Sequence, residues 1–273
     1  MKKSILAAAL LAAFAAPTAL VSSACAEEAA AAPALTANIG LFSSYRFRGI
    51  DQTFGKPALQ GGFDYAHSSG FYVGNWNSNV SSGAGFPDGN LEMDFYGGYK
   101  KAFGDFGLDV GAIYYYYPGS EMRGYTGGVN TGAADNKEVY IGGSWKFVSL
   151  KYSYAIDDYF ATRGDSGAKT RGTSYLDLSA NYDLGNGWGV NGHVGHLDYK
   201  NVTNGSYTDY KVGVTKDING WVVGASWVDT NANSGFYTIR NSISDDGAGG
   251  TTTGSKTKDA GRGIAILSVS RTF

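Results

Sequence analysis

Cysteine, charged residues and long apolar runs are all scarce in this sequence. Its 273 residues contain a single Cys, and only 17% are charged. A disulfide-stabilised scaffold and a highly charged disordered chain are therefore excluded. The one apolar run long enough for a membrane helix lies at the N-terminus, which excludes a polytopic helical membrane protein. Glycine and aromatic residues are abundant instead, with 41 Gly and 14% aromatics, which disfavours helix bundles and indicates an all-β protein.

The N-terminus has the pattern of a secretory signal. A basic start is followed by an Ala- and Leu-rich apolar stretch over 5–21, and small residues precede and include Ala26. We expect residues 1–26 to be cleaved, which leaves 27–273 as a single outer-membrane β-barrel domain without cysteine. Lipidation at Cys25 is the alternative, although the residue three positions before it is not the Leu of a lipoprotein signal.

The remaining chain alternates between apolar and polar residues with a period of two. In the stretch 138–147, Val139 and Ile141 share one parity, while Glu138 and Ser144 share the other. Successive side chains of a strand point to opposite faces, so such a stretch has one apolar and one polar face. Twelve segments follow this pattern, at 36–48, 57–67, 70–80, 90–101, 106–117, 137–147, 149–160, 173–184, 187–199, 207–217, 220–230 and 262–273.

The connections between these segments alternate strictly between short and long. Two-residue links such as Gly185-Asn186 are followed by long ones such as 118–136 and 231–261. This order predicts an up-and-down meander with tight turns at one end and long loops at the other.

Two architectures are compatible with such a meander. A soluble barrel or sandwich buries the apolar parity, whereas a transmembrane barrel turns it toward lipid and keeps the polar parity inside. The strands are long enough to cross a bilayer, their number is even, and the last one ends at Phe273. We therefore predict a transmembrane antiparallel up-and-down β-barrel of about twelve strands, with short periplasmic turns and long extracellular loops. Aromatic residues that we assign to interfacial girdles are Trp76, Tyr99, Tyr114, Tyr116, Trp145, Trp188, Trp221 and Trp227.

Several motifs resemble the TorF-type porin family of bacterial outer-membrane proteins. They include Ser43-Ser44-Tyr45-Arg46-Phe47-Arg48-Gly49, Glu92-Met93-Asp94-Phe95-Tyr96-Gly97-Gly98-Tyr99 and His193-Val194-Gly195-His196. The resemblance covers nearly the whole mature chain and implies an outer-membrane porin without catalytic residues. Arg271 departs from the pattern, because it stands where barrel-assembly signals usually carry an apolar residue.

The polar parity predicts the side chains that would line a pore. Arg46 and Arg48 lie two residues apart, so we expect them to point the same way from the first strand, toward Asp64 of the next. Our hypothesis is that this pair meets an acidic ladder across the constriction and that the resulting field sorts polar solutes. The alternative is that the charges only solvate and brace the interior. The predicted lining residues are Arg46, Arg48, Asp64, Glu92, Asp94, Asp109, Glu138, Lys146, Lys151, Asp177, Asp209 and Lys211.

The strand number predicts a narrow pore. Barrels of eight strands are filled by side chains, whereas those of 16–18 strands hold a wide aqueous channel. Either 118–136 or 231–261 is long enough to fold inward and narrow the pore further, although 231–261 could equally remain an external loop.

These features predict a porin-like channel in the Gram-negative outer membrane for passive diffusion of small hydrophilic solutes or ions. Expected partners are outer-membrane lipids, lipopolysaccharide and the barrel assembly machinery, which would engage the C-terminal strand ending in Phe273. No catalytic residue, cofactor, metal or nucleic-acid partner is predicted. Two other functions remain open. One is a non-conducting structural or adhesive barrel, and the other is an outer-membrane lipase, for which no Ser, His and acid are seen to share one face.

Overall fold

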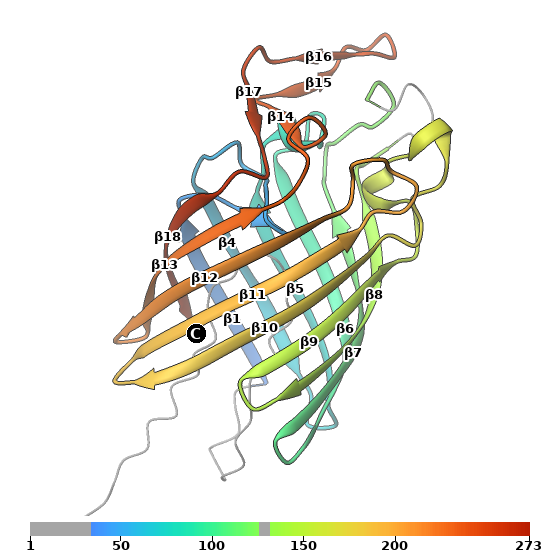
Figure 1. Ribbon diagram of the computed structural model, residues 1–273. Coiled ribbons are helices and arrows are strands. Elements are labelled where there is room, and N and C mark those ends of the chain that lie inside the picture. Colours follow the sequence, from blue (N-terminus) through green and yellow to red (C-terminus); the bar gives the residue numbers. More distant parts are fainter. Residues whose placement is uncertain (1–33, 126–131) are drawn as a thin grey trace, which may run out of the picture.

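The protein forms a closed ring of twelve antiparallel strands, as predicted. The computed structural model describes residues 34–125 and 132–273, so the expected signal segment 1–26 lies outside the described residues. Consecutive barrel strands pair with each other, and β1 closes the ring by pairing with both β4 and β18 (Figure 1). Closure leaves no free edge in the sheet. The barrel strands are β1 (Leu35–Phe42), β4 (Ala58–Ala66), β5 (Phe71–Asn79), β6 (Leu91–Phe103), β7 (Phe106–Tyr116), β8 (Asn136–Trp145), β9 (Val148–Ala155), β10 (Ser174–Gly185), β11 (Trp188–Asp198), β12 (Tyr207–Ile218), β13 (Trp221–Thr230) and β18 (Ile264–Thr272).

Short turns join the strands at one end of the barrel and long segments join them at the other (Figure 1). The turn between β12 and β13 has Asn219 and Gly220 at positive φ, 55° and 84°, as two-residue hairpins of type I′ require. The long segments carry small elements: β2 (Arg46–Phe47) with β3 (Ile50–Asp51), β14 (Thr238–Arg240) with β17 (Thr257–Asp259), β15 (Ile243–Asp245) with β16 (Thr251–Thr253), and the 3₁₀ turns η1 (Ser82–Ala84), η2 (Tyr159–Ala161) and η3 (Asp165–Gly167). Among the described residues, no helix is long and apolar enough to cross a membrane.

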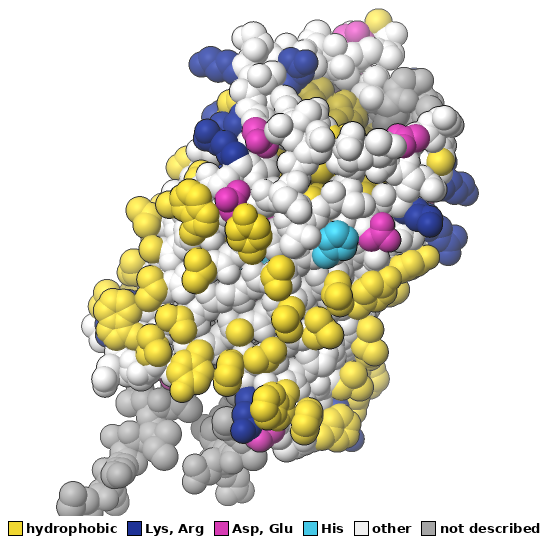
Figure 2. Space-filling model, viewed as in Figure 1, with side chains coloured by type: hydrophobic (Ala, Val, Ile, Leu, Met, Phe, Trp, Pro, Cys, Tyr) yellow, Lys and Arg dark blue, Asp and Glu magenta, His cyan; other side chains and the backbone are white. Residues whose placement is uncertain are grey.

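The apolar parity of the strands faces outward. Val212 and Leu267, for example, are 65% and 64% exposed, although both lie in the middle of long strands. On the face shown in Figure 2, hydrophobic side chains cover the strands, and charged side chains gather toward the ends of the barrel. An exposed apolar surface of this extent requires an apolar surrounding, as the hydrocarbon of a bilayer provides.

The structure differs from the expected strands at two of the long-loop ends. The first strand stops at Phe42 rather than continuing to Arg48, and β9 stops at Ala155 rather than near Phe160. In both places the chain leaves the wall before the expected end of the strand. Trp76 also differs from the girdle assignment, because it points into the barrel and packs edge-to-face against Tyr45, with ring centroids 5.5 Å apart.

Glycines of the inward parity make room for tyrosine rings that lie across neighbouring strands. A Cβ at Gly98 would lie 2.7 Å from the Tyr72 hydroxyl, and one at Gly111 would lie 2.5 Å from the Tyr140 hydroxyl. Both contacts are shorter than a side chain allows. The glycines thus let the inner wall hold large rings flat against the sheet.

Cations lie over aromatic rings near the short-turn end of the barrel. Arg271 lies 5.4 Å from the ring centroid of Trp221 and 5.2 Å from that of Phe273. Lys146 lies 5.0 Å from the ring of Trp145 in the same way. The unusual Arg271 of the last strand is therefore accommodated by a cation–π contact at the rim.

Candidate pore constriction

A small hairpin formed by β2 and β3 lies inside the barrel mouth, and we call it the luminal hairpin (46–51). Arg48 and Gly49 join its two strands and have φ values of 48° and 79°, the backbone of a type I′ turn. A Cβ at position 49 would lie 2.6 Å from the Cβ of Asp209 on β12. Only glycine therefore lets the hairpin tip approach the wall this closely.

The luminal hairpin spans the lumen. The chain enters it from β1, whereas the side chain of Arg48 reaches Glu138 on β8, a strand nearly opposite β1 in the ring. The main-chain carbonyl of Arg48 accepts a hydrogen bond of 2.8 Å from the Tyr207 hydroxyl at the start of β12. The hairpin is thus anchored to walls other than the one it leaves.

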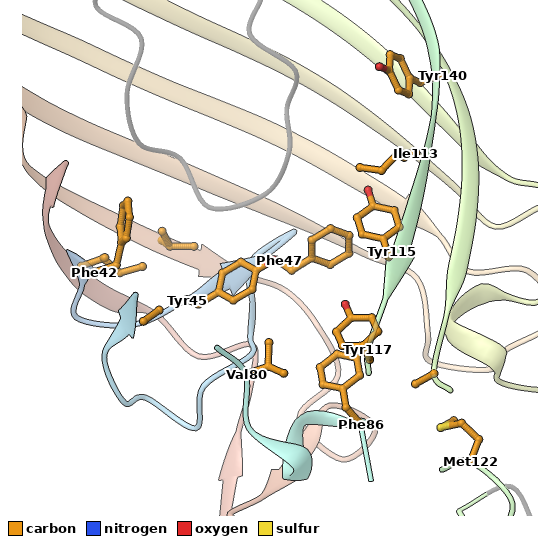
Figure 3. Close-up of a cluster of buried hydrophobic side chains, with 14 residues drawn as sticks. Phe42, Tyr45, Phe47, Val80, Phe86, Ile113, Tyr115, Tyr117, Met122 and Tyr140 are labelled. Atoms are coloured by element: carbon orange, nitrogen blue, oxygen red, sulfur yellow. The ribbon is translucent and has the colours of Figure 1, made fainter. Parts of the chain in front are cut away.

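Aromatic packing holds the hairpin and the preceding turn against the wall. The ring of Phe47 lies edge-to-face with Tyr115 of β7, with centroids 5.5 Å apart, and Figure 3 shows Tyr45 and Phe47 directed toward the cluster around Tyr115 and Tyr117. Tyr45 is fully buried and donates a hydrogen bond of 3.0 Å to Glu92. Its burial and the nearby Glu92 carboxylate raise the pKa of Tyr45, so the phenol remains a donor.

The guanidinium of Arg48 sits in a site made by two strands of the wall, β8 and β10, and by the 3₁₀ turn η2. It forms two parallel hydrogen bonds to the Glu138 carboxylate, of 3.0 and 2.7 Å, and donates a third of 2.9 Å to the Tyr159 hydroxyl. Its central carbon lies 4.4 Å from the ring centroid of Tyr175 on β10. Burial disfavours the charge of Arg48, but Glu138 more than offsets this effect and holds the pKa of Arg48 above its usual range. We call Glu138, Tyr159 and Tyr175 the guanidinium box.

Arg46 points elsewhere. Its guanidinium donates to the carbonyl of Ala260, in the segment before β18, and lies 3.7 Å from Asp51 of the same hairpin. Burial lowers the pKa of Arg46, and the Asp51 carboxylate opposes that shift. Lys258 joins the same cluster, because its ammonium lies 4.0 Å from the Asp51 carboxylate, and it also donates a hydrogen bond of 2.7 Å to the carbonyl of Phe54. The two arginines therefore bind different partners and do not form a pair.

The wall beside the guanidinium box carries more acid than base. Glu92 and Asp94 on β6 are both fully buried. Within the described part of the chain, neither carboxylate oxygen of Asp94 has a hydrogen-bond partner, and neither does Oε2 of Glu92. Buried carboxylates are costly without donors or cations, so this region favours positive charge.

Below the hairpin, charged residues form one row around the inner wall. The strand register places Lys100 opposite Asp109, and Lys151 opposite Asp177. Gly142 lies between Asp109 and Lys151 in the same row. Opposite charges on adjacent strands attract each other, so this row braces the barrel as well as polarising its interior.

His193 of β11 lies between two carboxylates on the inner face. Its Nδ1 is 3.0 Å from Asp177 and its Nε2 is 3.4 Å from Asp209. Ser179 is opposite His193 in the strand register and donates to Asp177. A Ser, a His and an acid thus do share one face, contrary to the sequence reading. Both imidazole nitrogens lie against carboxylates, however, so neither is placed to accept the proton of Ser179.

The structure distributes the predicted lining residues over three environments. Arg46 and Arg48 belong to the luminal hairpin rather than to the first strand, and Asp64 accepts a hydrogen bond of 2.6 Å from Tyr96 instead of facing them. Lys146 lies in the exposed turn between β8 and β9, because that turn interrupts the period of two. The inner wall carries Asp64, Glu92, Asp94, Asp109, Glu138, Lys151, Asp177, Asp209 and Lys211.

Sequence reasoning missed several residues of this interior. Lys100 shares the parity of Asp94, Tyr175 shares that of Asp177, and His193 has the parity opposite to the outward Trp188, so the same alternation could have found them. Tyr159 carries no such signal, because it lies in a 3₁₀ turn outside the wall. Over residues 34–125 and 132–273, no three His, Cys, Asp or Glu side chains are arranged to hold a metal ion.

We compared the chain with curated proteins, solved structures and protein-family models. No curated protein matches it. Among solved structures, it is similar to a NanC porin at 9% identity, covering 88% of this chain and 99% of that one with a TM-score of 0.49. A KdgM porin in complex with disordered oligogalacturonate is 8% identical, with 88% and 98% covered and a TM-score of 0.46. OccAB4 of Acinetobacter baumannii is 13% identical, with 89% and 63% covered and a TM-score of 0.39. The family model described as a bacterial protein of unknown function, Gcw_chp, matches residues 26–256, and the chain therefore belongs to the Gcw_chp family.

Proposed function

We propose that this protein is an outer-membrane porin through which small hydrophilic solutes diffuse passively. The observation that carries the proposal is the inversion of polarity in a closed twelve-stranded barrel, with apolar side chains outside and charged side chains on the inner wall. A barrel of this size has a wider interior than the side-chain-filled eight-stranded barrels. The resemblance to TorF-type porins in the Ser43–Gly49 motif supports the same function.

The proposed location is the bacterial outer membrane, with the short turns in the periplasm and the long loops outside the cell. The N-terminal export pattern and Phe273, which directly follows β18, support this orientation and engagement of the barrel assembly machinery. Outer-membrane lipids and lipopolysaccharide would then surround the apolar outer face.

We infer that the luminal hairpin closes the pore in the state described here. Among the described residues, it is joined to the wall by side-chain contacts and single hydrogen bonds, such as that from the Tyr207 hydroxyl to the Arg48 carbonyl, and not by a strand ladder. Such contacts can be exchanged without breaking the barrel. Conduction would require the hairpin to leave its position across the lumen.

Planar bilayer recordings test the proposal. We compare the wild-type protein with a variant in which a Gly-Ser linker of equal length replaces residues 46–51. In a control variant, the same linker replaces residues 246–251, which lead from β15 into β16 outside the barrel. We expect larger and longer openings in the first variant only. A hairpin variant that folds and inserts but carries no current contradicts a pore.

The second candidate function is a non-conducting structural or adhesive barrel. Two strand ribbons, β14 with β17 and β15 with β16, stand beyond the barrel mouth (Figure 1) and offer a surface for contacts outside the membrane. The same recordings separate the two functions, since an adhesive barrel needs no current in any variant.

A further inference from the structure

The guanidinium box binds the side chain of Arg48 through contacts that a cationic group of a solute could also make. The Glu138 carboxylate binds Arg48 through both oxygens, at 3.0 and 2.7 Å. The Tyr159 hydroxyl accepts a third hydrogen bond, and the ring of Tyr175 lies 4.4 Å from the guanidinium carbon. A bidentate carboxylate combined with an aromatic face is the arrangement by which proteins recognise guanidinium and ammonium groups.

The box and its occupant lie on different parts of the molecule. Glu138 and Tyr175 belong to β8 and β10 of the barrel, and Tyr159 belongs to the segment that joins β9 to β10. Arg48 instead lies at the tip of the luminal hairpin. Withdrawal of the hairpin would therefore remove the occupant and leave the box assembled on the wall.

The surroundings of the box add negative charge. Glu92 and Asp94 are buried on the same inner wall, close enough to the box for the charges of Asp94 and Glu138 to interact. The side-chain carboxylate of Asp94 has no hydrogen-bond partner among the described residues, and Asn136, which donates 3.0 Å to Glu138, has an unpartnered side-chain carbonyl oxygen that is itself buried. The charge of Asp94 thus adds to that of Glu138, while Lys151 lies near Glu138 and offsets part of this charge. A box vacated by Arg48 would have an uncompensated Glu138 carboxylate and would attract cations.

We propose that the guanidinium box is a binding site for small solutes that carry a guanidinium or primary ammonium group, and that Arg48 occupies it as a tethered competitor. Binding of such a solute to Glu138 displaces Arg48, so the solute itself favours withdrawal of the luminal hairpin. This inference rests on the proposed porin function, because it names the class of solute that the pore admits.

Binding is tested first, without any current, on folded protein in detergent. The probe is free arginine, and the matched control is citrulline, in which an uncharged urea group replaces the guanidinium. Arg48→Ala empties the box, so calorimetry should detect arginine and not citrulline, and R48A/E138Q should bind arginine about tenfold more weakly or not at all. Lys256→Ala, a substitution of an exposed residue between β16 and β17, should bind arginine as the wild-type protein does. Equal binding of arginine and citrulline overturns the proposal.

The wild-type protein supplies a second test if R48A does not fold. Arginine added to the bilayer chamber should shorten the closed times of single channels, citrulline should not, and Glu138→Gln should abolish the effect of arginine. Channels that open but ignore arginine overturn the solute class and leave the porin function intact. Arginine binding in R48A without current in any variant overturns the porin function and leaves the binding site intact.

Discussion

Arg48 and Glu138 are 90 residues apart in the chain, yet their side chains form two hydrogen bonds of 3.0 and 2.7 Å inside the barrel. The arginine comes from the segment after β1, and the glutamate lies on the far side of the ring. Both side chains are almost completely buried, at 6% and 1% exposed. This single contact links the element that closes the lumen to the wall that would line it.

Removing either partner alone should destabilise the protein more than removing both. A buried charge left without its partner costs about 3–5 kcal/mol. We expect R48Q and E138Q each to lower the free energy of unfolding by an amount of this size. The loss for R48Q/E138Q should be smaller, because the double variant leaves no uncompensated charge. The measurement is urea unfolding from lipid vesicles.

An exposed ion pair provides the control. Lys137 and Asp157 lie 3.3 Å apart at the rim, and D157N should cost less than about 1 kcal/mol. Equal losses for the single and double variants of the Arg48–Glu138 pair would contradict a coupled contact.

A side chain at position 49 should open the pore without disrupting the barrel. G49A places a Cβ 2.6 Å from the Cβ of Asp209 at a φ of 79°, so the hairpin tip must move from the wall. We expect more frequent openings in single-channel recordings and unchanged heat-modifiable migration on gels.

The control for G49A is G167A. Gly167 has a similar φ of 77°, but a Cβ there has no neighbour within 4 Å. It should carry the same backbone strain without changing the current. Matching currents in the two variants would show that backbone strain, and not the position of the hairpin, governs opening.

The mouth of the barrel should lose stability in strong alkali. Burial raises the pKa of Tyr199 to about 12, above the ordinary value near 10. A raised pKa means that folding favours the neutral phenol, so this contribution is complete below about pH 10 and is lost as the pH rises toward 12. Stability of the wild type relative to Y199F should fall over that window, as measured by urea unfolding. A difference independent of pH would contradict the raised pKa of the partly buried Tyr199.

The cations near the short turns should favour insertion into anionic membranes. Arg271 lies over Trp221, and Lys216 lies 5.1 Å from the ring centroid of Trp188, where each can contact lipid phosphates. We expect R271Q/K216Q to fold more slowly into vesicles containing phosphatidylglycerol, with little change in pure phosphatidylcholine. K256Q/K200Q, at the long-loop end, should differ little from wild type. A uniform slowing in both lipids would indicate a structural role only.

Most of the barrel could be predicted from alternation alone. The strands β4, β6, β12 and β13 lie within two residues of their predicted bounds, because burial of one parity constrains each strand along its length. The prediction of the first strand was wrong beyond Phe42. The residues over 45–48 continue the alternation of apolar and polar types, yet all of them are buried inside the lumen, so the alternation there does not mark a wall with two faces. The prediction that Lys146 lines the lumen was wrong for a different reason, because a tight turn reverses the chain between Trp145 and Val148.

The sequence by itself determined the ring of strands and the polarity of its two faces, because the period of two assigns each side chain to lipid or lumen through local geometry. It did not determine which charges meet inside. Closure of the ring brings β8 nearly opposite β1, and the type I′ turn at Gly49 directs the hairpin across the gap. Only the tertiary structure therefore joined Arg48 to Glu138 and left the Asp94 carboxylate without a hydrogen-bond partner among the described residues. Contacts between strands that are distant in sequence depend on how the ring closes, and the local alternation of residues carries no information on which strands then face each other.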